Sequence, residues 1–264
     1  MSPLLAATRA ELTKMLTSRT VRLFVGVVIG LHLLISWVNL RQNIAAVDAI
    51  TPQGVIELFP GEPRPAERAI VELLAASTLQ IVAIFLPVVA AVIAGQEFRA
   101  GQLSLSMLAV PRRGRLLASK SIAIALFLSA VTVVVEAIST LFVWLAVKDW
   151  NPGLLTTGPA LGEQGRLLLF AVTTGLVSFA LTTIVRGTLG GVVVTVALLF
   201  LAMGQVLAPV LDALLPISAG RNLILDPVGN NLTAGPAYAV VVLIGWSLMT
   251  VAAAGWVLHR RDAR

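Results

Sequence analysis

Long apolar runs alternate with polar segments along this chain, and each run has about the 20 residues that a helix needs to cross a bilayer. The runs are Leu23–Leu40, Leu73–Gly95, Ser121–Val147, Leu167–Val185, Thr188–Val210 and Tyr238–Leu258. The pattern predicts an all-α integral membrane protein with six transmembrane helices, in a single transmembrane domain over residues 1–264.

The segment before the first run also carries helix signals. Ser2-Pro3 is a hydroxyl cap followed by proline at the first helical position. In the helix that follows, charged residues such as Arg9 and Arg19 recur too often for the hydrocarbon core. One arc is apolar and collects Leu4, Leu5, Leu12, Met15 and Leu16, whereas Lys14, Thr17 and Ser18 lie opposite. We expect an N-terminal interfacial helix, in preference to a simple extension of the first span.

The segment before the last run is half apolar but interrupted. Between Leu211 and Pro236 it contains Pro216, Gly220 and Pro227, so it is too broken to cross the bilayer. We expect short re-entrant segments there, before the sixth span.

The composition excludes a soluble protein. The chain is 58% hydrophobic and only 12% charged, which leaves too little polar surface to cover a water-soluble core. Its net charge of +6 is explained by orientation rather than by binding to nucleic acid. With the N-terminus inside the cell, 13 of the 19 Lys and Arg residues are cytoplasmic and nine of the 13 acidic residues are outside. Both termini are therefore expected in the cytoplasm.

Several kinds of chemistry have no sequence signal. The chain has no cysteine and no G-x-x-x-x-G-K-[ST] phosphate loop, so we expect neither thiolate metal ligands nor ATP hydrolysis by that route. His32 and His259 are far apart, and no His, Asp and Glu residues have metal-ligand spacing. No serine lies in G-x-S-x-G. The chain is not expected to be an enzyme or to bind a metal or cofactor.

Glu136 is the acidic residue inside a predicted span. A carboxylate there costs on the order of 3 kcal/mol on insertion scales, which makes it a candidate for the translocation path. The alternative is a structural carboxyl group hydrogen-bonded near Thr132, Ser139 or Thr140 of its own helix. For His32, in the first span, we favour a packing role.

Two glycine pairs have the spacing that lets helices approach closely. They are Gly26 and Gly30 in the first span, and Gly187 and Gly191 at the start of the fifth. The spacing is compatible with a dimer interface or with packing inside one six-helix bundle.

A basic island, Glu97 to Lys120, separates the second and third runs. Its cations mark a cytoplasmic loop. They are Arg99, Arg112, Arg113, Arg115 and Lys120, against Glu97 alone. At helical spacing Phe98, Gly101, Leu105 and Leu108 share one apolar face, although residues 103–107 also alternate like a strand. Pro111 ends whatever element precedes it.

The order Glu97, Gly101, Pro111-Arg112-Arg113 and Lys120 resembles the loop between the second and third spans of ABC-2 type permeases of ATP-binding-cassette transporters. Their typical pattern is E-x-x-x-G-T, a leucine-rich stretch, P-x-R and a following K. Gln102 stands where Thr is usual. Residues 215–220 and 260–263 look like those of actinobacterial members.

The resemblance implies a cytoplasmic coupling helix after the second span. The residues implied to contact the ATPase are Glu97, Phe98, Arg99, Gly101, Gln102, Leu105 and Leu108, and Pro111, Arg112, Arg113 and Lys120 complete the loop motif. The implied partners are two copies of a separate cytosolic ATPase, which binds ATP and Mg²⁺, and a second permease copy or homologue. In that family the first span of one permease faces the fifth span of the other.

The resemblance also implies a multi-pass protein in the plasma membrane of a prokaryote, exporting an amphipathic or hydrophobic compound such as an antibiotic or peptide. Two other functions stay open. One is a proton-coupled secondary transporter that uses Glu136, and the other is a membrane anchor or sensor that transports nothing.

Overall fold

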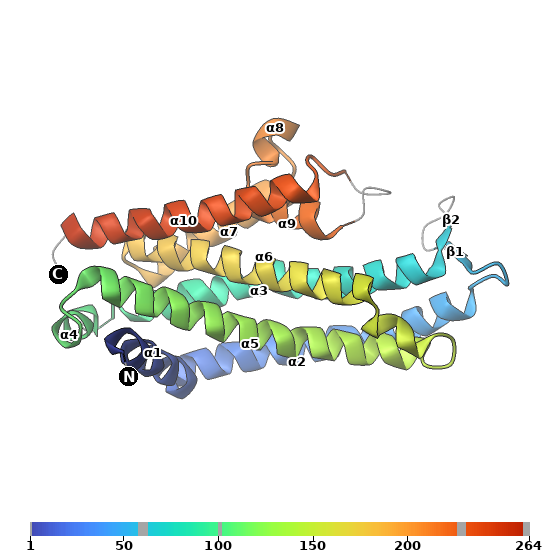
Figure 1. The fold of residues 1–264 in the computed structure, drawn as a ribbon, viewed down its shortest axis with the longest axis horizontal. Coiled ribbons are helices and arrows are strands. Elements are labelled where there is room, and N and C mark those ends of the chain that lie inside the picture. The colour runs from blue at the N-terminus through green and yellow to red at the C-terminus, as the bar shows by residue number, and fades with distance from the viewer. Residues whose placement is uncertain (1, 58–62, 100–101, 226–230, 261–264) are drawn as a thin grey trace.

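The structure is a computed structural model that describes residues 2–57, 63–99, 102–225 and 231–260. Within these ranges the chain is almost entirely helical, and its long helices lie side by side in an elongated bundle (Figure 1). Five described helices are long and apolar enough to cross a membrane: α2 (Arg19–Asp48), α3 (Ala66–Gln96), α5 (Arg113–Val147), α6 (Gly158–Val185) and α10 (Pro236–Arg260). The protein is therefore an all-α, multi-pass membrane protein.

Helices α3 and α6 form the centre of the bundle. They pack on each other, α10 packs on α6, and α2 packs on α5. The apolar stretches of α3 and α6 are each 61% buried, whereas that of α2 is only 17% buried. The centre contains Leu86, Leu128 and Phe170, all fully enclosed. Helix α2 is thus a peripheral helix with a wide apolar surface, as expected for contact with lipid or with another subunit.

The fifth predicted run does not form one long helix. Helix α7 (Thr188–Met203) has 16 residues, which is about 24 Å at 1.5 Å per residue and shorter than a hydrocarbon core of about 30 Å. It ends at Gly204, and Gln205 then takes a positive φ of 47°. The chain continues through α8 (Pro209–Asp212) and α9 (Pro216–Ile224) to α10. The prolines that begin α8 and α9 supply no N–H for continuing a helix, which explains the breaks.

Polar contacts join α8 to α9 and connect this segment to α10. The Asp212 carboxylate accepts hydrogen bonds from Ser218 (2.8 Å), Arg221 (2.6 Å) and Thr233 (3.2 Å). Trp246 of α10 donates its indole N–H to the Leu214 carbonyl at 2.7 Å. Within the described residues, the first part of the interrupted segment therefore forms two short helices joined by polar contacts.

The first helix is separate from the second. Helix α1 (Pro3–Thr17) begins with the Ser2 side chain accepting a hydrogen bond from the Leu5 amide at 3.3 Å, as the sequence predicted. Ser18 has an extended ψ of 120° and caps α2 with its hydroxyl, so the two helices meet at an angle. Helix α1 packs mainly on α5 and buries Thr8 and Met15.

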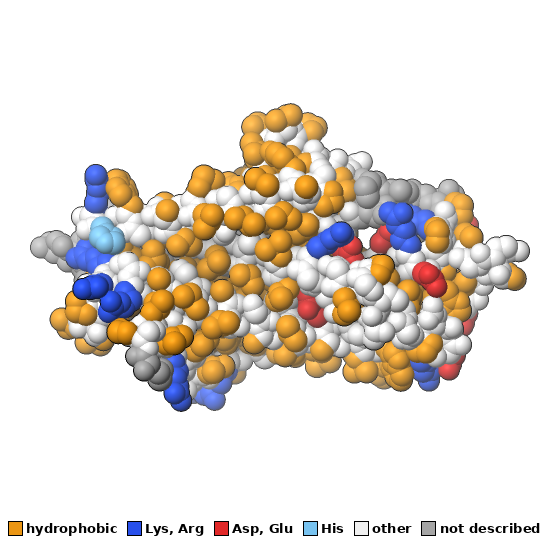
Figure 2. All heavy atoms as spheres, in the orientation of Figure 1, with side chains coloured by type: hydrophobic (Ala, Val, Ile, Leu, Met, Phe, Trp, Pro, Cys, Tyr) orange, Lys and Arg blue, Asp and Glu red, His pale blue; other side chains and the backbone are white. Residues whose placement is uncertain are grey.

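The two ends of the bundle differ. At one, the basic end, lie the start of α1, the end of α10 and the short helix α4 (Gln102–Ala109), with Lys and Arg side chains around them (Figures 1 and 2). At the other, the distal end, β1 (Val55–Glu57) pairs antiparallel with β2 (Pro63–Pro65), and the 3₁₀ helix η1 (Pro152–Thr156) joins α5 to α6. Both ends of the described chain thus lie at the same end of the bundle.

Candidate functional site

The basic island forms a compact site at the basic end. Helix α3 ends just before Glu97, and the Leu103 amide donates a hydrogen bond to the Glu97 carbonyl at 2.9 Å, which turns the chain into α4. Helix α4 ends at Ala109, two residues before Pro111, and α5 begins at Arg113. A short helix of eight residues therefore follows α3, at the place where the resemblance implies a coupling helix, and the coupling role stays a prediction.

The Glu97 carboxylate is the centre of this site. It is 7% exposed and joins four helices. Lys120 of α5 places Nζ 2.8 Å from Oε2, Ser106 of α4 donates to Oε2 at 3.1 Å, and Lys14 of α1 pairs with Oε1. Lys120 also lies 2.7 Å from Oε1 of Glu11 on α1. We call Glu11, Lys14, Glu97 and Lys120 the ion network.

The ion network is electrically balanced, with two carboxylates and two ammonium groups. Burial acts to raise the pKa of Glu97, but the charges of Lys120 and Lys14 and their hydrogen bonds outweigh it and hold that pKa below its ordinary value. Glu97 is therefore ionised at neutral pH. A fully paired charge cluster of this kind fixes the position of α1 relative to α3, α4 and α5.

Sequence reasoning found half of this network. Glu97 and Lys120 were both predicted as loop residues, although Glu97 was expected to face an ATPase. Glu11 and Lys14 were missed, because Lys14 was placed on the polar arc of a helix lying on the membrane. Their spacing of three residues, which puts both on one helix face, was the available signal.

The predicted apolar face of α4 is divided in the structure. Phe98 packs inward against the central core, together with the buried Leu103. Leu105 and Leu108 point outward and are 66% and 77% exposed. Arg99 and Gln102 are also exposed, and Gly101 lies outside the described residues. The single face of Phe98, Gly101, Leu105 and Leu108 is therefore corrected to an outward pair, Leu105 and Leu108.

The arginines after α4 have different surroundings. Pro111 and Arg112 are exposed, whereas Arg113 donates to the carbonyls of Leu258 at 2.5 Å and His259 at 3.1 Å. These carbonyls belong to the last turn of α10, where a helix has unpaired acceptors and a partial negative charge. Arg113 thus joins the C-terminal helix to the island.

His32 of α2 is a buried polar side chain that contacts α5. His32 Nε2 is 2.9 Å from the Ser139 hydroxyl and 3.1 Å from the Val135 carbonyl, and the Thr78 and Ser139 hydroxyls are 2.8 Å apart. This chain of contacts joins α2, α3 and α5 and supports the packing role for His32.

Glu136 is 8% exposed, and its Oε1 has no hydrogen-bond partner among the described residues. The neighbours that the sequence suggested are engaged elsewhere. Thr132 donates to the Leu128 carbonyl at 2.8 Å, Thr140 accepts from Gln164 at 3.1 Å, and Ser139 contacts His32. Hydrogen bonding to these neighbours therefore does not explain the buried carboxyl group.

The two glycine pairs are placed differently. Around Gly26 and Gly30, on the exposed side of α2, nothing lies within 4 Å of where a Cβ would be. A Cβ on Gly191 would lie 2.1 Å from the Thr182 hydroxyl of α6. Gly191 thus serves close packing of α7 on α6 within the chain, which favours, for this glycine, the alternative of packing inside one bundle. Gly187 is the N-cap of α7 and has open space at its Cβ position.

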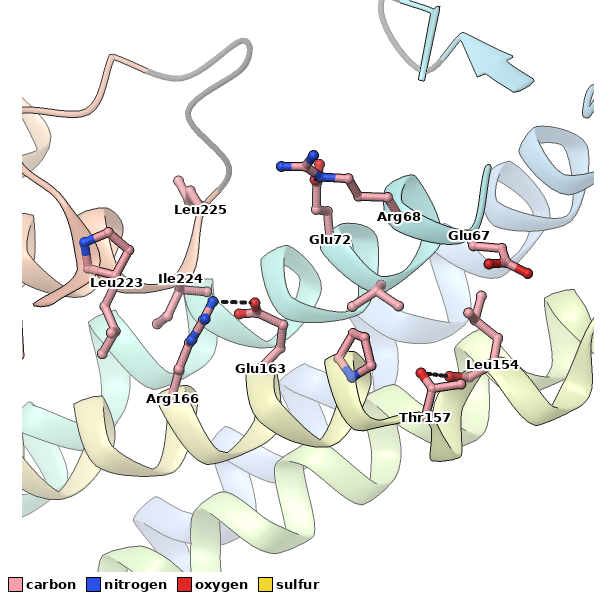
Figure 3. Close-up of a pocket in the computed structure, with 13 residues that line it drawn as sticks. Glu67, Arg68, Glu72, Leu154, Thr157, Glu163, Arg166, Leu223, Ile224 and Leu225 are labelled. Atoms are coloured by element: carbon pink, nitrogen blue, oxygen red, sulfur yellow. Dashed lines mark hydrogen bonds and ion pairs between the residues drawn. The ribbon is translucent and has the colours of Figure 1, made fainter. Parts of the chain in front are cut away.

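The distal end contains a cavity that sequence reasoning did not foresee. It lies between α3, α6 and α9, has a volume of about 640 Å³ and is lined by both apolar and charged side chains (Figure 3). Among the described residues, no group of three or more His, Cys, Asp or Glu side chains could hold a metal ion.

Comparison with known proteins adds no assignment. No protein-family model matches the chain, and no curated protein sequence matches it. Functional inference therefore depends on the residues and their geometry.

Proposed function

We propose that this protein is the membrane permease of an ABC-2 type ATP-binding-cassette exporter, driven by a separate cytosolic ATPase. The observation that carries the proposal is α4, a short helix directly after α3 that presents Leu105 and Leu108 outward while Glu97 ties its base to α1 and α5. Exposed leucines on a charged, water-facing end favour a protein partner. The ion network would transmit a displacement of α4 to α1, α3 and α5, because its charged groups join these four helices.

The proposed topology places the basic end in the cytoplasm of a prokaryotic cell, because Lys and Arg residues gather there. Both described chain ends lie at that end, which requires an even number of crossings. Five long helices therefore need a sixth passage, which we assign to α7 completed by α8 and α9. In this arrangement α1 lies at the cytoplasmic interface, and α8 and α9 lie in the outer leaflet, where they complete the passage that α7 begins.

The proposal is tested by changing the outward leucines. Leu105→Glu and Leu108→Glu should each reduce copurification of an ATPase from native membranes by about tenfold, since burying an unpaired carboxylate at a protein interface costs about 1.4 kcal/mol or more. Leu105→Met keeps an apolar side chain at the same position and serves as the matched control variant.

Partner proteins would be identified by mass spectrometry. Capture of a P-loop ATPase by the parent and by Leu105→Met, but not by the Glu variants, would support the proposal. If the parent captures a signalling protein and no nucleotide hydrolase, the chain is a membrane anchor or sensor.

A proton-coupled secondary transporter is the second candidate function. The observation that favours this function is the buried carboxyl group of Glu136, whose Oε1 has no hydrogen-bond partner among the described residues and lies inside a span. In proteoliposomes without ATPase, a pH gradient should then drive substrate flux in the parent and not in Glu136→Gln. ATP-dependent flux that persists without a pH gradient would exclude this mechanism.

A further inference from the structure

The distal cavity has the size and position of a ligand site. Its volume of about 640 Å³ lies within the range of about 300–1,000 Å³ that holds small organic ligands. Helices α3 and α6 form its walls, and η1, α9 and the start of α10 complete it. Charged side chains of both signs lie around a hollow in this part of the surface (Figure 2).

The cavity lining is amphipathic. Its apolar residues are Val71, Leu154, Pro159, Leu223, Ile224, Leu225 and Pro236, and its ionisable residues are Glu67, Arg68, Glu72, Glu163 and Arg166. Such a surface matches a molecule with an apolar body and charged groups. The ionisable side chains of the lining would pair with the charged groups of the ligand, which would be strongly disfavoured in a purely apolar cavity.

One carboxylate in the lining, that of Glu67, forms no ion pair with any described residue. Glu72 lies 2.9 Å from Arg64 and 3.1 Å from Arg68, and Glu163 lies 2.5 Å from Arg166. Glu67 accepts a hydrogen bond only from the neutral amide of Asn151, at 3.2 Å, among the described residues. Glu67 lies in the first turn of α3 and is exposed, so its carboxylate is open to an ammonium group.

One guanidinium in the lining has donors to spare. Arg166 uses Nη1 toward Glu163, and the side chain is 46% exposed. A guanidinium has five N–H donors, and the others of Arg166 make no hydrogen bond to the described residues. In Figure 3, Arg166 lies toward the Ile224 side of the cavity, beside Glu163, and Glu67 lies toward the Leu154 side.

We propose that this cavity binds a zwitterionic amphiphile, with its ammonium group at Glu67, its anionic group at Arg166 and its apolar body against Val71, Leu154 and Ile224. The inference that this amphiphile is the exported compound rests on the proposed function. The same chemistry has two sources: a lipid with a phosphoethanolamine head group, or a short apolar peptide with free termini.

Binding can be measured without transport. Purified protein in a non-ionic detergent would be titrated with lysophosphatidylethanolamine and with trileucine, and complexes counted by native mass spectrometry. Lysophosphatidylglycerol and dodecyltrimethylammonium supply the anion or the cation alone. At least one zwitterion should bind about tenfold more tightly than either singly charged probe, which corresponds to one charge-assisted contact.

Two variants test the two charged contacts. Glu67→Gln and Arg166→Gln should each weaken binding of the zwitterion by about threefold to tenfold, with the fold intact because both side chains are largely exposed. Asp48→Asn and Arg41→Gln are matched controls on exposed positions of α2, outside the cavity, and should bind like the parent.

Binding of the lysolipid alone would identify the lipid source, and binding of trileucine alone would identify the peptide source. The proposal is overturned if neither zwitterion binds, or if Glu67→Gln and Arg166→Gln both bind like the parent. Leu105→Glu separates the two proposals, since it should lose the ATPase and keep the zwitterion. Failure of ATPase capture with normal zwitterion binding would therefore reject only the proposed function.

Discussion

Lys120 contributes most to the stability of the ion network. It lies within 2.8 Å of both Glu97 and Glu11, and its side chain is only 8% exposed. Lys14 is 36% exposed, so water screens its attraction for Glu97. Removing a buried charge leaves its partners unpaired, which costs more than the pair itself contributes.

We therefore expect Lys120→Met to lower the free energy of unfolding by about 3 kcal/mol and Lys14→Met by about 1 kcal/mol or less. Adding Glu97→Gln to Lys120→Met should restore part of the loss, because one unpaired carboxylate is removed. Thermal unfolding in detergent measures both effects. Equal losses for the two lysine variants would contradict this account of the network.

The same network makes stability depend on pH. The pKa of Glu97 is lowered in the folded state, so its contribution is present above the ordinary carboxyl value and is lost as pH falls through the lowered one. The parent should therefore lose more stability on acidification than Glu97→Gln does.

At the level of helices, the sequence predicted most of the long elements. Apolar length alone located α2, α3, α5, α6 and α10, because a spanning helix needs only a sufficient apolar run. It overestimated α7, whose run continues to Val210 although the helix ends at Met203. Gly204 and the turn at Gln205 end it, and apolar residues beyond that point do not reveal a bend.

Contacts between helices could not be predicted in the same way. Glu97 and Lys14 are 83 residues apart in sequence, and Glu11 and Lys120 are 109 apart. Helical periodicity shows which residues share a face, but not which face of another helix they meet. The distal cavity is likewise assembled from α3, α6 and α9, so neither Glu67 nor Arg166 stood out along the chain.

Helix packing gives a prediction for the glycine pairs. Gly191→Ala should destabilise the protein by about 1–3 kcal/mol, because its Cβ would overlap the Thr182 side chain and overpack the α6–α7 contact. Gly26→Ala on the open side of α2 should not destabilise the protein, and the higher helix propensity of alanine should stabilise it by up to about 1 kcal/mol.

Gly26→Leu extends this test to a second permease copy. If Gly26 meets another subunit, the larger side chain should reduce crosslinking between copies while thermal unfolding stays the same. Destabilisation by Gly26→Ala equal to that by Gly191→Ala would mean that α2 packs differently from the structure.

For the whole molecule, the two ends have distinct chemistry. The basic end carries the ion network, the outward leucines of α4 and both described chain ends, and the distal end carries the amphipathic cavity. A central pair, α3 and α6, extends between these ends. In the proposed exporter, a movement of the ATPase at α4 would therefore act on α3, which α4 follows in the chain. The first turns of α3 line the cavity.

Contact between α4 and an ATPase in living cells is the most direct test of this account. A photo-crosslinking amino acid at Leu105 would be activated in the native host, with Leu248 on the exposed side of α10 as the control position. The account predicts a crosslink from position 105, and not from 248, to a cytosolic protein with a P-loop. Repeated absence of any nucleotide hydrolase among the products from position 105, with the protein inserted in the membrane, would contradict it.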